Sequence, residues 1–277
     1  MIVGWRSRFF ICFLLTAMAS FAGRRPDEMR QDSLVDVLLA APSFGIYKEN
    51  YFLTGINRME RFSSVNCNVK YQISLWKRLT RSVLPFRSYL FMTYTQKSFW
   101  NIYQKSCPFE DNNYNPALGL GRFVLDGDRV RAQMAFVFDH ESNGADGRKS
   151  RSWNRFAYHV MIPTSVNGNL QVQLWIPWAM SVYNENYDCY RGFGNVTYNL
   201  RTDNHCLWFS LSTSFCPIWN RQYNLQLDAA CRLPFFENVY FLLQFYCGYA
   251  EQMLMYDHFR HSVRIGVSYK PPFFSLY

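Results

Sequence analysis

The chain has 277 residues, a formal net charge of +9 and an aromatic content of 19%. Hydrophobic residues make up 49% of it, yet the mean hydropathy is −0.20, so apolar and polar residues are intermixed instead of gathered in long runs. This mixture is typical of transmembrane β-barrels. It excludes membrane-spanning helices, because no segment reaches the roughly 18 to 20 apolar residues that such a helix needs. The basic residues are too scattered to predict a nucleic-acid-binding surface.

Residues 1–22 are predicted to be a secretory signal peptide. Arg6 and Arg8 precede an apolar run over residues 9–19, which ends among small residues. A run of about eleven apolar residues is too short to span a bilayer as a helix. We expect residues 23–43 to form an N-terminal periplasmic segment with a short amphipathic helix near 34–40, and residues 44–277 to form the main domain.

Alternation of apolar and polar residues follows and recurs to the end of the chain. It is clearest over residues 69–75, 170–176, 207–212, 223–228 and 263–270. A period of two is the signature of a strand with two different faces. The pattern predicts about twelve strands of roughly ten residues each, the length that a tilted strand needs to cross a bilayer. The predicted fold is all-β, an antiparallel transmembrane β-barrel of the outer-membrane type; a soluble β-sandwich, which also alternates, is the alternative.

The connections between the strands alternate in length. Short turns are expected at residues 126–128, 167–169 and 202–204, after even-numbered strands, and long loops at 103–113, 181–191 and 250–261, after odd-numbered ones. Outer-membrane barrels have short periplasmic turns and long external loops. The aromatic end at Tyr277 fits the final strand of such a barrel, although Pro271 and Pro272 interrupt the pairing just before it.

Polar side chains occur on a face that is otherwise apolar. His140 and Ser142 alternate in step with Phe136 and Phe138, and on the next strand Asn154 shares a face with several apolar side chains. Polar groups that face lipid are costly unless they hydrogen-bond to one another. A serine bonded to an imidazole that is in turn bonded to an amide gives a nucleophile, a base and an orienting group.

Asparagine supplies no full negative charge to an imidazolium. Oxyanion stabilisation must then come from backbone N–H groups near Asn143 and Gly144, or from a metal ion. A histidine and a serine two residues apart also occur by chance in many chains, so the prediction depends on Asn154 sharing their face.

These residues belong to a set of motifs that resembles a known family, the outer membrane phospholipases A of Gram-negative bacteria. The similarity extends from about Pro42 to Tyr277. The matching motifs are residues 94–100 (YTQKSFW), 106–109 (SCPF), 113–116 (NYNP), 140–144 (HESNG) and 150–155 (SRSWNR).

The resemblance implies a twelve-stranded barrel in which Ser142 attacks phospholipid acyl esters, with His140 as base and Asn154 as orienting residue. It also implies support of the site by Gln96 through hydrogen bonds, although a polar side chain facing the lumen is the other interpretation of Gln96. Gly144 is placed at the oxyanion. The active form would be a homodimer.

The resemblance further implies dependence on Ca²⁺, bound between two protomers. The ligands would be the carbonyl of Ala145, the hydroxyl of Ser150 and the partner subunit's Ser106. Glu185 matches an additional acidic ligand, in a loop that is shorter than the family's, and Ala145 stands where the family commonly has arginine. Ordinary solvation in loops is the alternative interpretation of both serines. A site of neutral oxygens should bind Ca²⁺ weakly, at roughly 0.1 to 1 mM.

The predicted function is that of a calcium-dependent phospholipase of the bacterial outer membrane, of the A1/A2 and lysophospholipase type. With the amino terminus in the periplasm, the fifth strand, near residues 129–142, runs outward and carries Ser142 to the outer leaflet. The alternatives are a lipid A deacylase, which would use similar chemistry on another lipid, and a non-enzymatic porin.

Overall fold

The computed structural model describes residues 42–57, 63–80, 84–127, 129–215 and 222–272. The expected signal peptide, almost all of the N-terminal segment with its helix, and residues 273–277 lie outside the described residues. Among the described residues, no helix has the length and apolarity to cross a membrane.

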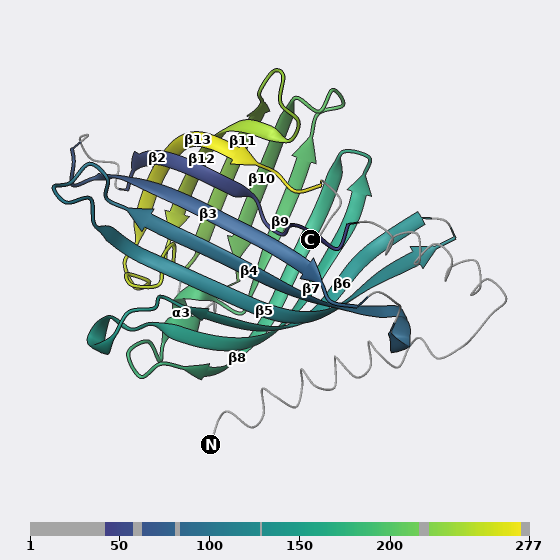
Figure 1. Ribbon diagram of the computed structural model, residues 1–277, viewed down its shortest axis with the longest axis horizontal. Helices are drawn as coiled ribbons and strands as arrows, with labels where there is room; N and C mark the ends of the chain where they lie inside the picture. The colour runs from purple at the N-terminus through teal and green to yellow at the C-terminus, as the bar shows by residue number, and fades with distance from the viewer. Residues whose placement is uncertain (1–41, 58–62, 81–83, 128, 216–221, 273–277) are drawn as a thin grey trace.

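Thirteen strand segments and three short helical turns make up the described chain (Figure 1). The strands are β1 (Phe44–Ile46), β2 (Asn50–Ile56), β3 (Cys67–Arg78), β4 (Ser88–Trp100), β5 (Phe109–Asp126), β6 (Arg129–Ser142), β7 (Ser152–Ser165), β8 (Gly168–Met180), β9 (Gly194–Arg201), β10 (Leu207–Ser214), β11 (Asn224–Arg232), β12 (Val239–Gly248) and β13 (Arg260–Tyr269). The helical turns are η1 (Pro85–Arg87), η2 (Gly147–Lys149) and α3 (Tyr187–Arg191).

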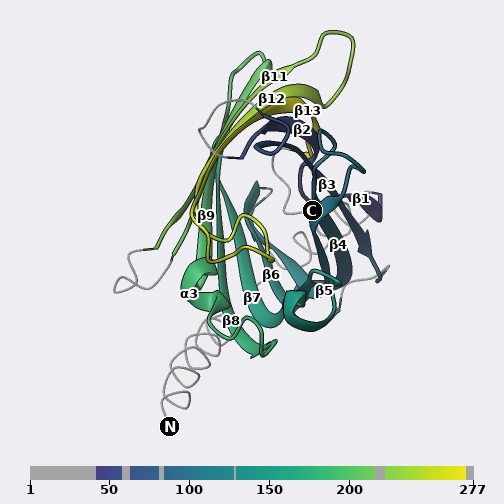
Figure 2. The same ribbon diagram turned by 90° about the vertical axis from the view of Figure 1, so that its left-hand side faces the viewer.

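The strands close into an antiparallel barrel, which confirms the predicted fold. From β2 onwards each strand pairs with the next strand in the sequence, and β13 pairs with β2 to complete the ring seen end-on in Figure 2. β1 and β2 both pair with β3, and their registers on it differ by two residues. They are therefore two halves of one barrel strand, interrupted at residues 47–49, and the barrel has twelve strands.

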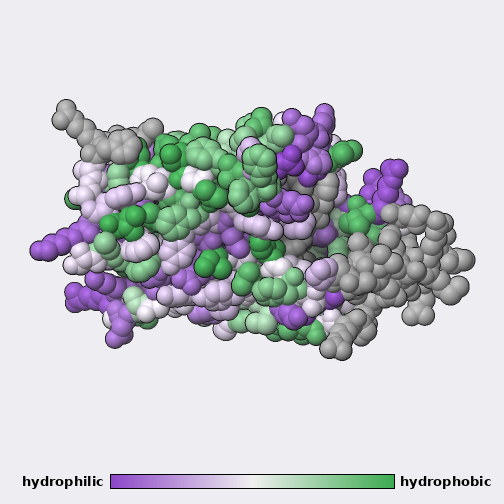
Figure 3. Space-filling view, turned by 45° about the horizontal axis from the view of Figure 1, so that its top comes forward, coloured by the Kyte–Doolittle hydropathy of each residue, from purple (hydrophilic) through white to green (hydrophobic). Residues whose placement is uncertain are grey.

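Sequence alternation sorts the side chains between the two faces of the wall. Along β6, Phe136 and Phe138 are 38% and 39% exposed, whereas Ala135, Val137 and Asp139 are buried. Figure 3 shows apolar side chains over much of one side of the wall, and strongly hydrophilic ones projecting at its ends. An apolar outer face and a polar interior are what a lipid environment requires of a barrel.

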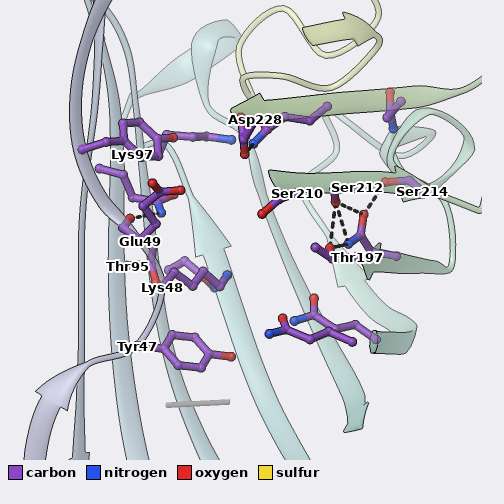
Figure 4. A pocket seen from close by; sticks show the side chains of 18 of the residues that line it. Tyr47, Lys48, Glu49, Thr95, Lys97, Thr197, Ser210, Ser212, Ser214 and Asp228 are labelled. Carbon is purple, nitrogen blue, oxygen red and sulfur yellow. Dashed lines mark hydrogen bonds between the residues drawn. The ribbon is translucent and has the colours of Figure 1, made fainter. Parts of the chain in front are cut away.

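The interior holds a polar cavity of about 310 Å³. Figure 4 shows Tyr47, Lys48 and Lys97 along one side of it, facing Thr197 and Ser212 across the space. The interrupted first strand contributes Tyr47 and Lys48 to this lining, so the break turns side chains of the wall into the lumen.

The loop between β12 and β13, residues 249–259, packs into the lumen from the outer end (Figure 2). Glu251 is 3% exposed and forms ion pairs with Lys70 of β3 at 3.1 Å and with Arg264 of β13 at 2.6 Å. Met253 is fully buried. Through Glu251, the loop thus connects β13, which follows it, to β3, near the amino terminus of the barrel.

The predicted connections agree with the structure except at their edges. The turn near 167–169 is shorter than predicted, because β8 begins at Gly168, and β5 begins at Phe109, so the loop expected at 103–113 covers only residues 101–108. The latter error arose because residues 110–113 are all polar, which resembles a loop. In the structure Asp111 and Asn113 face the interior of the barrel and are buried.

Candidate active site

His140 and Asn154 lie directly opposite each other on β6 and β7. Their side chains point outward, on the same face as Phe138 and Phe156. The imidazole Nδ1 lies 2.9 Å from the amide Oδ1 of Asn154. Because an amide oxygen only accepts, Nδ1 donates in this bond, and Nε2 is the ring nitrogen that can act as a base in the neutral imidazole.

Ser142 ends β6 two residues beyond His140, on the same outward face, and pairs with Ser152 of β7. Its side chain is half-buried. In the described part of the chain, its hydroxyl makes no hydrogen bond to His140 or to any other group. The structure therefore brings the predicted base and the predicted orienting residue into contact, and places the serine beside them with its hydroxyl unengaged.

The loop that follows Ser142 is held closed by one buried side chain. Asn143 donates from Nδ2 to the carbonyl of Lys149 at 2.8 Å, and its Oδ1 accepts from the N–H groups of Arg151 at 2.8 Å and Ala145 at 3.3 Å. Asn143 is 7% exposed. These bonds bring the two ends of residues 143–151 together and fix the loop against the serine.

The N–H group of Gly144 has no acceptor among the described residues, unlike the N–H groups of its two neighbours. The N–H of Asn143 donates to Arg151 at 3.0 Å, and that of Ala145 donates to the Asn143 side chain. Gly144 has a φ of +65°, and a Cβ on it would lie 2.9 Å from the ring of Tyr114. Glycine is therefore required here both by its backbone conformation and by the close approach of a neighbour.

Oxygen atoms suited to Ca²⁺ occur in the loops at this end. The carbonyl of Ala145 and the hydroxyl of Ser150 belong to the loop that Asn143 closes, whereas Ser106 and Glu185 are exposed in two other loops. Carbonyl, hydroxyl and carboxylate oxygens are the ligands that Ca²⁺ prefers. No group of three or more His, Cys, Asp or Glu side chains gathers in the described part of the chain, so a site here would depend largely on neutral oxygens.

Gln96 faces outward from β4, so its interpretation as a lumen residue is wrong. It lies opposite Tyr114 of β5, which in turn lies opposite Ser142. Its side chain hydrogen-bonds to Tyr94 at 3.2 Å and Ser98 at 3.2 Å, and makes no bond to His140, Ser142 or Asn154 among the described contacts. Gln96 is therefore in the same outward row as the serine, two strands away.

The side-chain contacts of two asparagines escaped the sequence analysis. Asn143 closes the loop, and Asn115 of β5 donates to the carbonyl of His140 at 2.6 Å. Both fell within motifs that carried the family resemblance, but nothing in their spacing gave them a role. The hydrogen-bond partners of a buried amide depend on how the folded backbone arranges them around it, so the sequence alone does not reveal them.

Comparison with known proteins shows the family to which the sequence is similar. The family model described as phospholipase A1 matches residues 43–269. The phospholipase A1 of Proteus vulgaris is 33% identical over 238 residues, which cover 80% of this chain and 79% of that protein. The phospholipase A1 of Escherichia coli strain K12 is 32% identical over 207 residues, which cover 72% of this chain and 68% of that protein.

Solved structures show the same fold. Outer membrane phospholipase A from Escherichia coli superposes with a TM-score of 0.74 at 24% identity, covering 84% of this chain and 100% of the other. The outer membrane phospholipase dimer of Salmonella typhi, solved with bound calcium, gives a TM-score of 0.74 at 23% identity, covering 86% and 98%. On the extent and identity of the sequence matches, this chain belongs to the phospholipase A1 family.

Proposed function

We propose that this outer-membrane phospholipase hydrolyses the acyl esters of phospholipids with Ser142 as nucleophile, His140 as general base and Asn154 as orienting residue. The observation that carries the proposal is the 2.9 Å contact between His140 and Asn154 on the lipid-facing side of the barrel. A hydrogen-bonded imidazole beside a serine on that face has access to a substrate that lies in the membrane itself.

The mechanism begins with attack of the Ser142 hydroxyl oxygen on the ester carbonyl carbon. His140 takes the hydroxyl proton at Nε2, and Asn154 holds the ring through Nδ1–H. The intermediate then collapses, the C–O bond to the lysophospholipid breaks, and the departing oxygen receives the proton from His140. A water molecule, deprotonated by the same imidazole, hydrolyses the acyl-enzyme and releases the fatty acid.

The negative charge that develops on the ester oxygen requires a donor. Gly144 is suited to this because its N–H follows the nucleophile closely and has no acceptor among the described residues. A single neutral donor stabilises an oxyanion less than a pair of donors does. A second source of positive potential is therefore expected at this position.

Ca²⁺ would supply that potential. The donor set fits the ion: we propose that the Ala145 carbonyl and the Ser150 hydroxyl hold it, with the partner subunit's Ser106 and, as an additional acidic ligand, Glu185. When bound, the ion would stabilise negative charge near the nucleophile. Since Ser106 is exposed in a loop other than that of Ser142, sharing it between two protomers gives a reason for the active form to be a homodimer.

The experiment that tests the proposal is hydrolysis of phosphatidylcholine in mixed detergent micelles by the purified protein. We expect activity that excess chelator removes and that Ca²⁺ restores. Ser142→Ala should lose it, whereas Ser165→Ala, an exposed serine at the opposite end of β7, should keep it. Undiminished turnover by Ser142→Ala would show that another group is the nucleophile, and full turnover in chelator would remove Ca²⁺ from the mechanism.

A further inference from the structure

The lumen side of the catalytic strands carries a cluster of charged side chains. Asp139 and Glu141 point inward from β6 and Arg155 points inward from β7. Arg155 bonds to Oδ2 of Asp139 through Nε at 2.8 Å and Nη2 at 2.7 Å, and its Nη1 lies 3.9 Å from Glu141. We name Asp139, Glu141 and Arg155 the lumen clamp.

The clamp is enclosed by aromatic rings. Glu141 also accepts from the indole N–H of Trp153 at 3.0 Å. The guanidinium of Arg155 lies 4.5 Å from the ring centre of Trp153 and 5.1 Å from that of Trp175. Asp139 and Arg155 are 4% and 7% exposed. A guanidinium that bonds twice to one carboxylate oxygen and lies against two aromatic rings has little freedom to shift.

The clamp residues alternate with the outward-facing residues of the proposed active site. Asp139 precedes His140, Glu141 lies between His140 and Ser142, and Arg155 follows Asn154. In a strand, adjacent side chains share a peptide unit and point to opposite faces. The distance between β6 and β7 at the Arg155–Asp139 contact therefore also determines how the imidazole of His140 lies relative to the amide of Asn154.

The backbone ladder is irregular at the same level. The assigned pairing of β5 with β6 skips from Tyr114↔Ser142 to Ala117↔Asp139, which leaves Pro116, a residue with no N–H, facing His140. On the other side, the pairing of β7 with β8 shifts register between Asn154 and Arg155. Proline and register shifts both weaken a ladder locally. Side-chain contacts therefore have to hold the strands in place here, where the backbone pairing is weaker.

From these contacts we infer that the lumen clamp is the positioning element of the active site, holding His140 and Asn154 in register across β6 and β7 from the opposite face of the wall. The inference rests on the proposed function. Its residues touch no substrate, so they act through the two residues outside. A displacement of about 1 Å of a catalytic group is enough to lower the rate about 100-fold.

The test compares the double variant Asp139→Asn/Arg155→Met, which removes both charges of the pair together, with Glu49→Gln/Lys270→Met. Glu49 and Lys270 form another lumen ion pair, at 2.8 Å, that includes no strand of the proposed active site. Both variants are first checked for barrel formation by the heat-dependent shift in gel mobility. We expect kcat of the clamp variant to fall roughly 10- to 100-fold with little change in KM, and kcat of the control to stay within about twofold of wild type.

Two further measurements separate positioning from stability. The rate at which a sulfonyl fluoride modifies Ser142 should fall by the same factor as kcat, because it reports on the serine and its base without a lipid substrate. Arg155→Lys, which keeps the charge, should recover part of both rates. Glu141→Gln, which leaves the Asp139–Arg155 pair in place, provides a milder variant should the double variant not fold, with an expected fall of about 3- to 10-fold.

Equal kcat and labelling rates in folded clamp variants and wild type would overturn the inference and leave the proposed function standing. An equal loss in the Glu49–Lys270 control would overturn it as well, because the effect would then be one of general stability. Wild-type protein without phospholipase activity or Ser142 labelling would instead overturn both proposals.

Discussion

The lumen face and the lipid face of β6 and β7 hold their polar groups in opposite ways. On the lumen side, Arg155 bonds twice to Asp139 and lies against two tryptophan rings. On the lipid side, the imidazole of His140 has one hydrogen bond and the hydroxyl of Ser142 has none in the described structure. Extensive pairing stabilises the wall from inside, whereas the polar groups of the proposed active site outside are only partly paired. Substitutions on the two faces should therefore change different properties of the protein.

The two histidines of these strands give the largest expected contrast. His140→Ala should lower kcat by at least about 1,000-fold with little change in stability, because it removes the proposed base from the lipid face. His159 faces the lumen, is 4% exposed and lies 3.3 Å from the hydroxyl of Tyr47. His159→Ala should lower stability and leave kcat nearly unchanged. Assays of turnover and of urea unfolding by tryptophan fluorescence check both; a strong loss of kcat in His159→Ala would contradict the division between the faces.

Gly144, in the loop after β6, allows a second comparison, with another glycine of positive φ. Gly144→Ala should lower kcat by about 100- to 1,000-fold, because a displaced backbone N–H no longer reaches the oxyanion. Gly127→Ala is the matched control: its φ is +58°, close to the +65° of Gly144, but a Cβ there meets nothing within 4 Å. Kinetic constants measured on both should separate backbone strain from position. A similar kcat for the two variants would argue against a role of Gly144 in the reaction.

On the lumen side, Glu251→Gln should destabilise the barrel by about 3 kcal/mol, since it leaves Lys70 and Arg264 without their shared carboxylate. Burial alone would raise the pKa of Glu251, but Arg264 and Lys70 outweigh that effect and hold the pKa well below its ordinary range. A carboxylate with a depressed folded pKa stabilises above its unfolded pKa, about 4.3, and loses this contribution as pH falls below it.

The stability advantage of wild type over Glu251→Gln should therefore be full at neutral pH and shrink below about pH 4. Urea unfolding at several pH values measures it. Glu185→Gln, a change at an exposed loop carboxylate, should show no such dependence. An advantage that is constant down to acidic pH would mean that the ionised carboxylate contributes nothing.

The smallest effect is expected on the apolar part of the lipid face. Phe136 lies near the middle of β6 and is 38% exposed toward lipid. Phe136→Lys should cost about 2 kcal/mol when the protein is folded into vesicles, because a charge at that depth loses its hydration. Phe136→Leu should cost less than about 1.5 kcal/mol. A lysine tolerated without cost would place this residue outside the hydrocarbon layer.

The sequence predicted the strands and their two faces, because alternation of period two is a local property of the chain. It therefore also placed Ser142, His140 and Asn154 on one face. It could not predict that the first strand is broken at residues 47–49, nor that residues 109–113 extend a strand, since both depend on what the side chains meet inside the barrel. The same alternation directs Arg155 toward the lumen, but its carboxylate partners could not be predicted, because they follow from the register of β6 on β7.

The ion pairs of Glu251 also have a kinetic consequence. The residue lies 181 positions from Lys70 and 13 from Arg264, and the loop that carries it joins the last two strands. Contacts so distant in sequence form late, because the chain between them must first be ordered. Glu251 can meet both cations only when the first and last parts of the barrel have come together. Burial of this charge therefore requires that β3 and β13 already lie close together in the barrel.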